Sequence, residues 1–157
     1  MKIKDIKEFK RFLVEAKTNT YASGKEGVEK VLFVDGCKEL IFSQHPWLYR
    51  DRYFGTTHFI GEEIIFENKK AIWGMNYRGE ILDKKISDVD FAPFLKKALS
   101  NVREKIPFRG PKILKEKNKI YKNSVSGKIA NFQGKEEIYY GRKKVYELYY
   151  HGGFILK

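Results

Sequence analysis

Polar side chains recur inside stretches whose other residues are typical of β-strands. The segment "WGMNYRG" begins at Trp73 and sets Asn76 among glycines and large rings, while "FIGEEIIF" sets Glu63 after a glycine in an apolar run. In "LYRDRYFG", Asp51 has a tyrosine two residues away on each side. A glycine inside a strand costs stability and marks a bend or a close approach by another group. These segments therefore indicate either a ligand site or a sheet that simply curves.

A bent sheet can bring polar tips from several strands together at its concave side. The last predicted strand would contribute a carboxylate and an imidazole, and the proline-framed loop "IPFRGP" a guanidinium. The alternative is that these groups are solvated ends of strands, because buried unpaired acids are rare. The predicted ligand-binding residues are Asp51, Glu63, Trp73, Asn76, Tyr77, Arg109, Glu147 and His151.

Three kinds of chemistry fit this set of residues. In the first, amide, phenol and guanidinium groups bind a small polar or anionic molecule between aromatic walls, as in a sensor domain. In the second, a hydrolase-like acid–base enzyme uses Glu63 or Asp51 as the base and His151 as the acid. In the third, the lysine-rich surface binds nucleic acid without reading its sequence.

The net charge of +12 and the pI near 9.6 permit the nucleic-acid interpretation. The excess charge is scattered, and 25 of the 32 basic residues are lysines, which lack the forked donors of arginine. The densest basic run, Pro111 to Lys122, lies beside a predicted loop. Charge without a recognition motif favours a solvated surface over a phosphate-binding role.

Metal, cofactor and nucleophile motifs are absent from the sequence. The three histidines are scattered, and no HExxH, GxSxG, Walker or dinucleotide-binding pattern occurs, so we expect neither a metal nor a cofactor. The one cysteine, Cys37, cannot form an internal disulfide, which fits a reducing cytoplasm. The chain has no long apolar run and starts with a charged segment, so we expect a cytoplasmic protein without membrane attachment.

Two helices are predicted from apolar residues at helical spacing. In "DIKEFKRFLVEA" the apolar side chains follow one stripe, and Asp5 with Glu8 has the form of a capping box. In "DFAPFLKKALSNVR" the apolar stripe is continuous, Asp90 can cap the helix, and Pro93 would fall in the first turn.

Strands are predicted from short aromatic and β-branched runs separated by turn residues. The first group covers Lys38–Ser43, Leu48–Phe54, His58–Phe66 and Ala71–Tyr77. The second group covers Lys128–Phe132, Glu136–Tyr140 and Lys144–Tyr150, with turns at Gly134 and Gly141.

This order of elements predicts an α+β fold in one domain spanning residues 1–157. A curved antiparallel sheet of about six to eight strands, with both helices on one face, would hide both apolar stripes and give a cystatin-like or half-barrel outline. No internal repeat is evident in the sequence. Exposed strand edges make a homodimer possible.

The sequence also resembles a small prokaryotic family of domains of unknown function, some of which are fused behind a helix-turn-helix DNA-binding domain. The resemblance implies a sensing role and supplies no catalytic residues. Where the family leads us to expect a second tyrosine after Tyr77, this chain has Arg78. The segments that carry the resemblance are "FLVEAKTNTYAS" (Phe12–Ser23), "YRDRYFGTTHFIGEE" (Tyr49–Glu63), "WGMNYRG", "PFRGP" (Pro107–Pro111) and "YELYYHGG" (Tyr146–Gly153).

Overall fold

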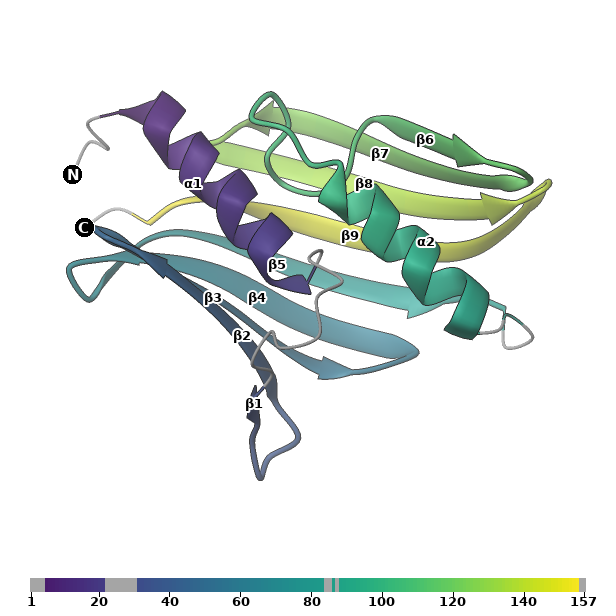
Figure 1. The fold of residues 1–157 in the computed structure, drawn as a ribbon, viewed down its shortest axis with the longest axis horizontal. Helices are drawn as coiled ribbons and strands as arrows, with labels where there is room; N and C mark the ends of the chain where they lie inside the picture. The colour runs from purple at the N-terminus through teal and green to yellow at the C-terminus, as the bar shows by residue number, and fades with distance from the viewer. Residues whose placement is uncertain (1–4, 22–30, 84–85, 87, 156–157) are drawn as a thin grey trace.

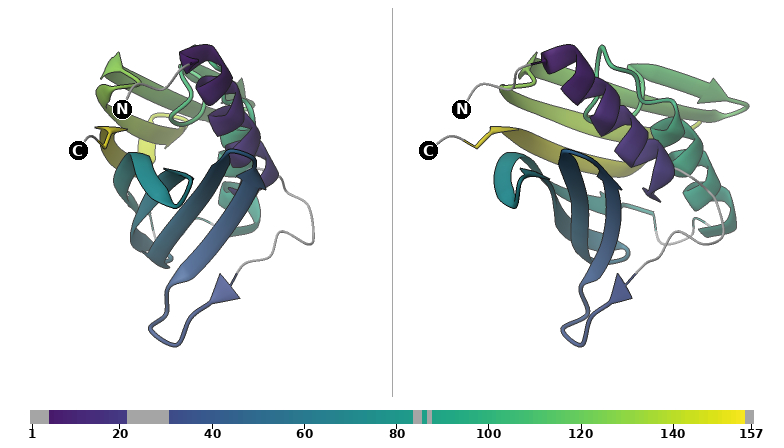
Figure 2. Two further views of the ribbon diagram at one scale, coloured as in Figure 1. Left: turned by 90° about the vertical axis from the view of Figure 1, so that its left-hand side faces the viewer. Right: turned by 60° about the vertical axis from the view of Figure 1, so that its left-hand side comes forward.

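Two helices lie on the inner side of one bent, open antiparallel sheet (Figures 1 and 2). A computed structural model of the chain describes residues 5–21, 31–83, 86 and 88–155. The α+β class, the open antiparallel sheet and the two helices on one face are confirmed. The sheet has nine strands when a two-residue strand at one edge is counted.

The sheet is built from two meanders that meet at its centre. The strand order is β1-β2-β3-β4-β5-β9-β8-β7-β6, so that β5 pairs with β9. The helices are α1 (Ile6–Asn19) and α2 (Asp88–Ser100). The strands are β1 (Val31–Leu32), β2 (Lys38–Gln44), β3 (Trp47–Gly55), β4 (His58–Glu67), β5 (Lys70–Ile81), β6 (Ile113–Glu116), β7 (Lys119–Lys128), β8 (Asn131–Tyr140) and β9 (Lys143–Phe154).

Helix α1 begins where a polar residue satisfies free backbone groups. Asp5 caps α1, because its Oδ1 accepts hydrogen bonds from the backbone N–H groups of Lys7 (2.8 Å) and Glu8 (3.0 Å). Helix α2 begins at Asp88, two residues earlier than predicted, so Pro93 lies in its second turn rather than its first. The apolar stripe of each helix is buried against the sheet.

Two strand predictions in the second meander were wrong. Strand β8 runs unbroken through Gly134, where the glycine suggested a turn, and the true turn follows Lys128. The basic run Pro111–Lys122, for which no strand was predicted, contains β6 and the start of β7. Gly134 serves a different purpose, because a Cβ atom there would lie 2.2 Å from Cζ of Tyr150, whose ring covers it.

The chain contains an internal repeat that the sequence analysis missed. Each half consists of one helix followed by a four-strand meander, α1 with β2–β5 and α2 with β6–β9. Both helices carry the pattern F-x-x-F-L-x-x-A, which starts at Phe9 in α1 and at Phe91 in α2. The side chains of this pattern are buried in both helices. We call the two units the first half and the second half.

The strands repeat as closely as the helices. The second strand of each meander carries a tyrosine followed two residues later by Asp or Asn, and the third carries G-x-E. A tyrosine from the fourth strand stands opposite that glycine in both halves. The equivalent pairs are Tyr49 and Tyr121, Asp51 and Asn123, Gly61 and Gly134, Glu63 and Glu136, and Tyr77 and Tyr150.

An approximate twofold axis relates the halves, and it passes through the centre of the sheet. Strands β5 and β9 occupy equivalent places and run antiparallel, with Tyr77 directly opposite its equivalent Tyr150. Met75 pairs with Gly152 and Gly79 pairs with Leu148, as such an axis requires. One hydrophobic core contains buried residues from both halves.

The tyrosines that face the helices are placed by glycines on the neighbouring strand. Gly61 leaves room for the ring of Tyr77, because a Cβ atom at this glycine would lie 2.5 Å from Cζ of the tyrosine. With the ring lying across its neighbouring strand, the hydroxyl reaches one strand further. In the segment "WGMNYRG", Tyr77 on β5 therefore crosses Gly61 on β4, and its hydroxyl reaches Asp51 on β3.

Candidate functional site

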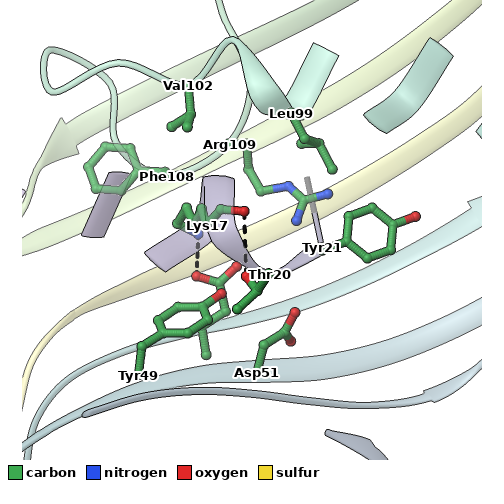
Figure 3. Close-up of a pocket in the computed structure, with 10 residues that line it drawn as sticks. Lys17, Thr20, Tyr21, Tyr49, Asp51, Leu99, Val102, Phe108 and Arg109 are labelled. Carbon is green, nitrogen blue, oxygen red and sulfur yellow. Dashed lines mark hydrogen bonds and ion pairs between the residues drawn. The ribbon is translucent and has the colours of Figure 1, made fainter. Parts of the chain in front are cut away.

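A small pocket lies between the end of α1, the first-half strands and the segment after α2 (Figure 3). Its cavity volume is about 20 Å³, which is room for about one water molecule. The preformed space is therefore much smaller than a metabolite-sized pocket. The side chains that line it come from Lys17, Thr20, Tyr21, Tyr49, Asp51, Glu63, Leu99, Val102, Phe108 and Arg109.

A buried ion pair joins helix α1 to strand β4 in this pocket. Lys17 Nζ donates to Glu63 Oε2, and both residues are almost fully buried, at 8% and 2% exposure. Burial lowers the pKa of Lys17, since charged ammonium loses its hydration, although the Glu63 carboxylate opposes this effect. Lys17 continues the apolar stripe of α1 at the position that Leu99 occupies in α2.

Asp51 is the second buried carboxyl group of the pocket. The Tyr77 hydroxyl donates to its Oδ1 at 2.6 Å, and the residue is 6% exposed. Among the described residues, no lysine, arginine or histidine forms an ion pair with it. Asp51 is therefore a buried acid whose hydrogen-bond donor is a neutral hydroxyl.

The surroundings of Asp51 shift its ionisation into the physiological range. Burial, and then the nearby Glu63 carboxylate, raise the pKa of Asp51 from 3.8 to about 7. The Tyr77 hydroxyl and the cations of Lys17 and Arg109 oppose this rise. The titratable groups around Asp51 come from every neighbouring element, namely Lys17 and Tyr21 at the end of α1, Tyr49 and Tyr53 on β3, Glu63 on β4, Tyr77 on β5 and Arg109 after α2.

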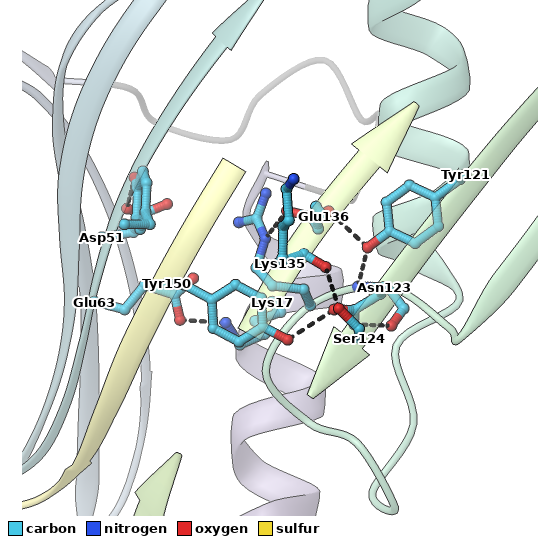
Figure 4. A network of polar contacts seen from close by, with 12 residues as sticks. Lys17, Asp51, Glu63, Tyr121, Asn123, Ser124, Lys135, Glu136 and Tyr150 are labelled. Carbon is cyan, nitrogen blue, oxygen red and sulfur yellow. Dashed lines mark hydrogen bonds and ion pairs between the residues drawn. The ribbon is translucent and has the colours of Figure 1, made fainter. Parts of the chain in front are cut away.

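The second half holds the equivalent network, built around Glu136 and Asn123 (Figure 4). Arg109 Nε donates to Glu136 Oε2 at 2.5 Å, and the Tyr121 hydroxyl donates to Glu136 Oε1 at 2.6 Å. Asn123 Oδ1 accepts a hydrogen bond from the Tyr150 hydroxyl at 2.7 Å. The Asn123 amide also donates to the carbonyl of Gly110 at 2.9 Å.

Arg109 connects the second-half network to the pocket in the first half. Its guanidinium carbon lies 5.6 Å from the centre of the Tyr77 ring, the same ring whose hydroxyl binds Asp51. A guanidinium over an aromatic face is attracted by the ring quadrupole. Arg109 therefore links the Glu136 network to the tyrosine that donates to Asp51.

Four of the eight residues predicted from the sequence meet on the helix-covered face. Asp51, Glu63 and Arg109 line the pocket, and Tyr77 contacts both Asp51 and Arg109. Trp73 lies on the same face but in the core, where its Nε1 donates to the carbonyl of Ile129 at 3.0 Å. The prediction that Trp73 forms a wall of the site was therefore wrong.

The other three predicted residues lie on the opposite, open face of the sheet. Asn76 and His151 are exposed and stand directly opposite each other on β5 and β9. Glu147 pairs on that face with Lys144 (2.7 Å) and Lys135 (3.3 Å). The prediction that they converge with Asp51 on the concave side was wrong, because each precedes or follows a helix-facing residue on its strand.

Several pocket residues escaped the sequence analysis, although some signals were present. Lys17 interrupts the buried stripe of α1, and a lysine in such a stripe needs a buried partner. Tyr49 stands two residues before Asp51 and so shares its face. The repeated G-x-E pattern marks Glu136 as the equivalent of Glu63.

Other features of the described residues bear on the kind of protein. Within them, no three His, Cys, Asp or Glu side chains lie together as a metal site needs. No helix in the described ranges has the length and apolarity to span a membrane.

Comparison with curated proteins and with solved structures gives no match. A family model described as a domain of unknown function, DUF5680, matches residues 51–155, from β3 to just beyond the end of β9. The chain therefore belongs to the DUF5680 family of domains of unknown function.

Proposed function

We propose that this protein is a small-molecule-binding domain, and that the pocket around Asp51 is its binding site. The observation that carries the proposal is the difference between the two halves at one position. Asn123 shows that a neutral amide satisfies the fold at this place in the sheet, with the equivalent tyrosine, Tyr150, as its donor. The first half instead holds a buried carboxyl group beside a cavity, at a cost in desolvation. Because the fold accepts a neutral amide at this position, the desolvation cost of the Asp51 carboxyl group supports a role for it in function.

The chemistry of the pocket supports binding of a polar molecule. Aromatic rings and aliphatic side chains form much of its lining, and two buried ion pairs hold its charged groups in place. Because the cavity is small, a ligand larger than a water molecule enters only as lining side chains move. The likeness to family members joined to DNA-binding domains supports a sensing role.

A ligand screen tests this proposal. Compounds of positive, neutral and negative charge are screened at pH 8 for a rise in melting temperature, and hits are measured by calorimetry. We expect Asp51→Asn to lower the affinity of a genuine ligand at least about tenfold, since a charge-assisted hydrogen bond is lost. His151→Ala, on the open face, is the matched control and should bind normally. Hits that bind Asp51→Asn equally well, or a screen with none, would contradict the proposal.

An acid–base enzyme is the second candidate, supported by the pKa of Asp51 near 7. A general base works best when its pKa is near the working pH. His151 cannot be its acid partner from the opposite face, so Lys17, whose pKa is lowered by burial, would have to take that place. Turnover of any substrate in a hydrolase panel, lost in Asp51→Asn but kept in His151→Ala, would favour this candidate.

Nucleic-acid binding stays a prediction. Four of the arginines already form ion pairs with glutamates, namely Arg50, Arg52, Arg78 and Arg109.

A further inference from the structure

The charged groups around the pocket do not balance. Among the described residues, Lys17 pairs with Glu63 and Arg109 pairs with Glu136. Within the described part of the chain, the third carboxyl group, Asp51, has no cation of its own, and it lies at the cavity. A ligand with a single positive charge would complete a third ion pair.

The lining around this carboxyl group also suits a cation. The rings of Tyr21 and Tyr49 line the pocket beside Asp51, and the negative face of an aromatic ring attracts ammonium groups. The two cations of the lining, Lys17 and Arg109, are already paired with glutamates. An anion would therefore have to compete with these glutamates and lie against the Asp51 carboxyl group. The expectation of an anionic ligand, made from the sequence, is therefore less favoured than a cationic one.

We propose that the pocket binds a small protonated amine, whose ammonium group forms an ion pair with Asp51; this inference rests on the binding function proposed above. Ammonium and the –NH₃⁺ group of methylamine are close in size to a water molecule, as a cavity of about 20 Å³ requires. A calcium ion would need six to eight oxygen ligands. The pocket lining offers two carboxyl groups, one of which is already paired with Lys17.

Calorimetry and thermal shift at pH 8 provide the test, with ammonium chloride and methylammonium chloride as probes. Sodium chloride and tetramethylammonium chloride at the same ionic strength control for salt, and the second also controls for size. Formamide and sodium formate represent neutral and anionic molecules of similar size. We expect the two small amines to raise the melting temperature of the wild-type protein and the four other compounds to leave it nearly unchanged.

The dependence on Asp51 is tested by substitution and by pH. Asp51→Asn should weaken amine binding at least about tenfold, while His151→Ala should bind as the wild type does. At pH 5.5 Asp51 is mostly protonated, so binding should also weaken by roughly tenfold or more. Near pH 7, binding displaces a proton, so the measured enthalpy should change with the ionisation enthalpy of the buffer.

The outcomes separate the amine inference from the binding function. One outcome is that formamide or formate stabilises the wild type but not Asp51→Asn, while the amines do not stabilise the wild type. In that case the proposed ligand class is wrong, and the pocket remains a binding site. Equal shifts from all four chloride salts, or amine binding that persists in Asp51→Asn, would also overturn the inference. If no compound here or in the wider screen binds, both proposals fail.

Discussion

Asp51 and Asn123 occupy equivalent positions in the two halves, and each accepts a hydrogen bond from the equivalent tyrosine, at 2.6 and 2.7 Å. The two side chains have almost the same shape, so the difference between them is a charge and a donor. In the second half the amide donates to a backbone carbonyl. In the first half the Asp51 carboxyl group titrates near neutral pH. The chain therefore contains its own neutral reference for Asp51.

The first prediction concerns Asp51→Asn and the pH dependence of stability. The pKa of Asp51 is higher in the folded protein, about 7, than its ordinary 3.8, so the folded state binds the proton more tightly. The contribution of Asp51 to the free energy of unfolding is fully present below about pH 4 and is lost as the pH rises through 7. Asp51→Asn should therefore be more stable than the wild type at pH 8, by about 2–4 kcal/mol, and similar at pH 4. Urea unfolding at several pH values measures this difference.

The reverse substitution, Asn123→Asp, is the matched control for this prediction. It removes the donor to the Gly110 carbonyl and puts a second buried charge near Glu136. We expect it to destabilise the protein at pH 8, in the opposite direction to Asp51→Asn. A gain in stability from Asn123→Asp, or a loss from Asp51→Asn, would show that the two positions are not equivalent.

The second prediction compares the two tyrosine hydroxyls. Tyr77→Phe removes the donor to a carboxylate, which should cost about 1.5–3 kcal/mol at pH 8 and less at pH 5, where Asp51 is protonated. Tyr150→Phe removes a donor to a neutral amide, which should cost about 1 kcal/mol at both pH values. Chemical denaturation of the two variants at both pH values makes the comparison. Equal pH dependence in the two variants would contradict the assigned ionisation of Asp51.

The third prediction concerns the buried ion pair of Lys17 and Glu63. Lys17→Leu introduces the residue that α2 carries at Leu99, but it leaves Glu63 buried without a cation. Such a loss costs about 3–5 kcal/mol, measured as the free energy of unfolding in urea. The double variant Lys17→Leu with Glu63→Leu removes both charges and should regain most of this loss. Lys7→Leu, on the exposed side of α1, is the control and should change stability little. If the double variant does not regain stability relative to Lys17→Leu, the two charges do not act as a pair.

The fourth prediction tests how glycines place the tyrosines. In Gly134→Ala the new methyl group would meet the Tyr150 side chain, which supplies the three atoms nearest to it. Overpacking of this kind costs about 1–3 kcal/mol. In a Tyr150→Ala background the same glycine substitution should cost much less, because the clashing ring is gone. A double-mutant cycle of unfolding free energies measures the coupling, and simple additivity would contradict the close approach.

Local sequence patterns predicted the elements well where periodicity and turns agreed. The stripe from Phe9 to Ala16 and its cap at Asp5 predicted α1, and four of the first-half strands lie where they were expected. Gly134 misled the prediction because a glycine under an aromatic ring and a glycine in a turn look alike in sequence. Only the register of β8 with β9 distinguishes the two.

The candidate site was half predictable for the same reason. Asp51, Glu63 and Tyr77 share a face by strand alternation once the strands pair in register. The predictions for His151 and Asn76 were wrong because each residue is adjacent in sequence to a tyrosine that faces the helices, so its own side chain lies on the opposite face. The polarity of a residue alone does not reveal which face of the sheet it occupies. The partners from α1 and from the segment after α2 depend on tertiary packing, which no local pattern encodes.

The meeting of β5 and β9 at a twofold axis has a consequence for how such a site can arise. In an assembly of two identical chains related by such an axis, any change at this place in the sheet would occur twice, once on each side of the axis. In a single chain that carries both halves, the two positions can differ. One copy can then keep the amide that the architecture needs, as at Asn123, while position 51 takes on an acid.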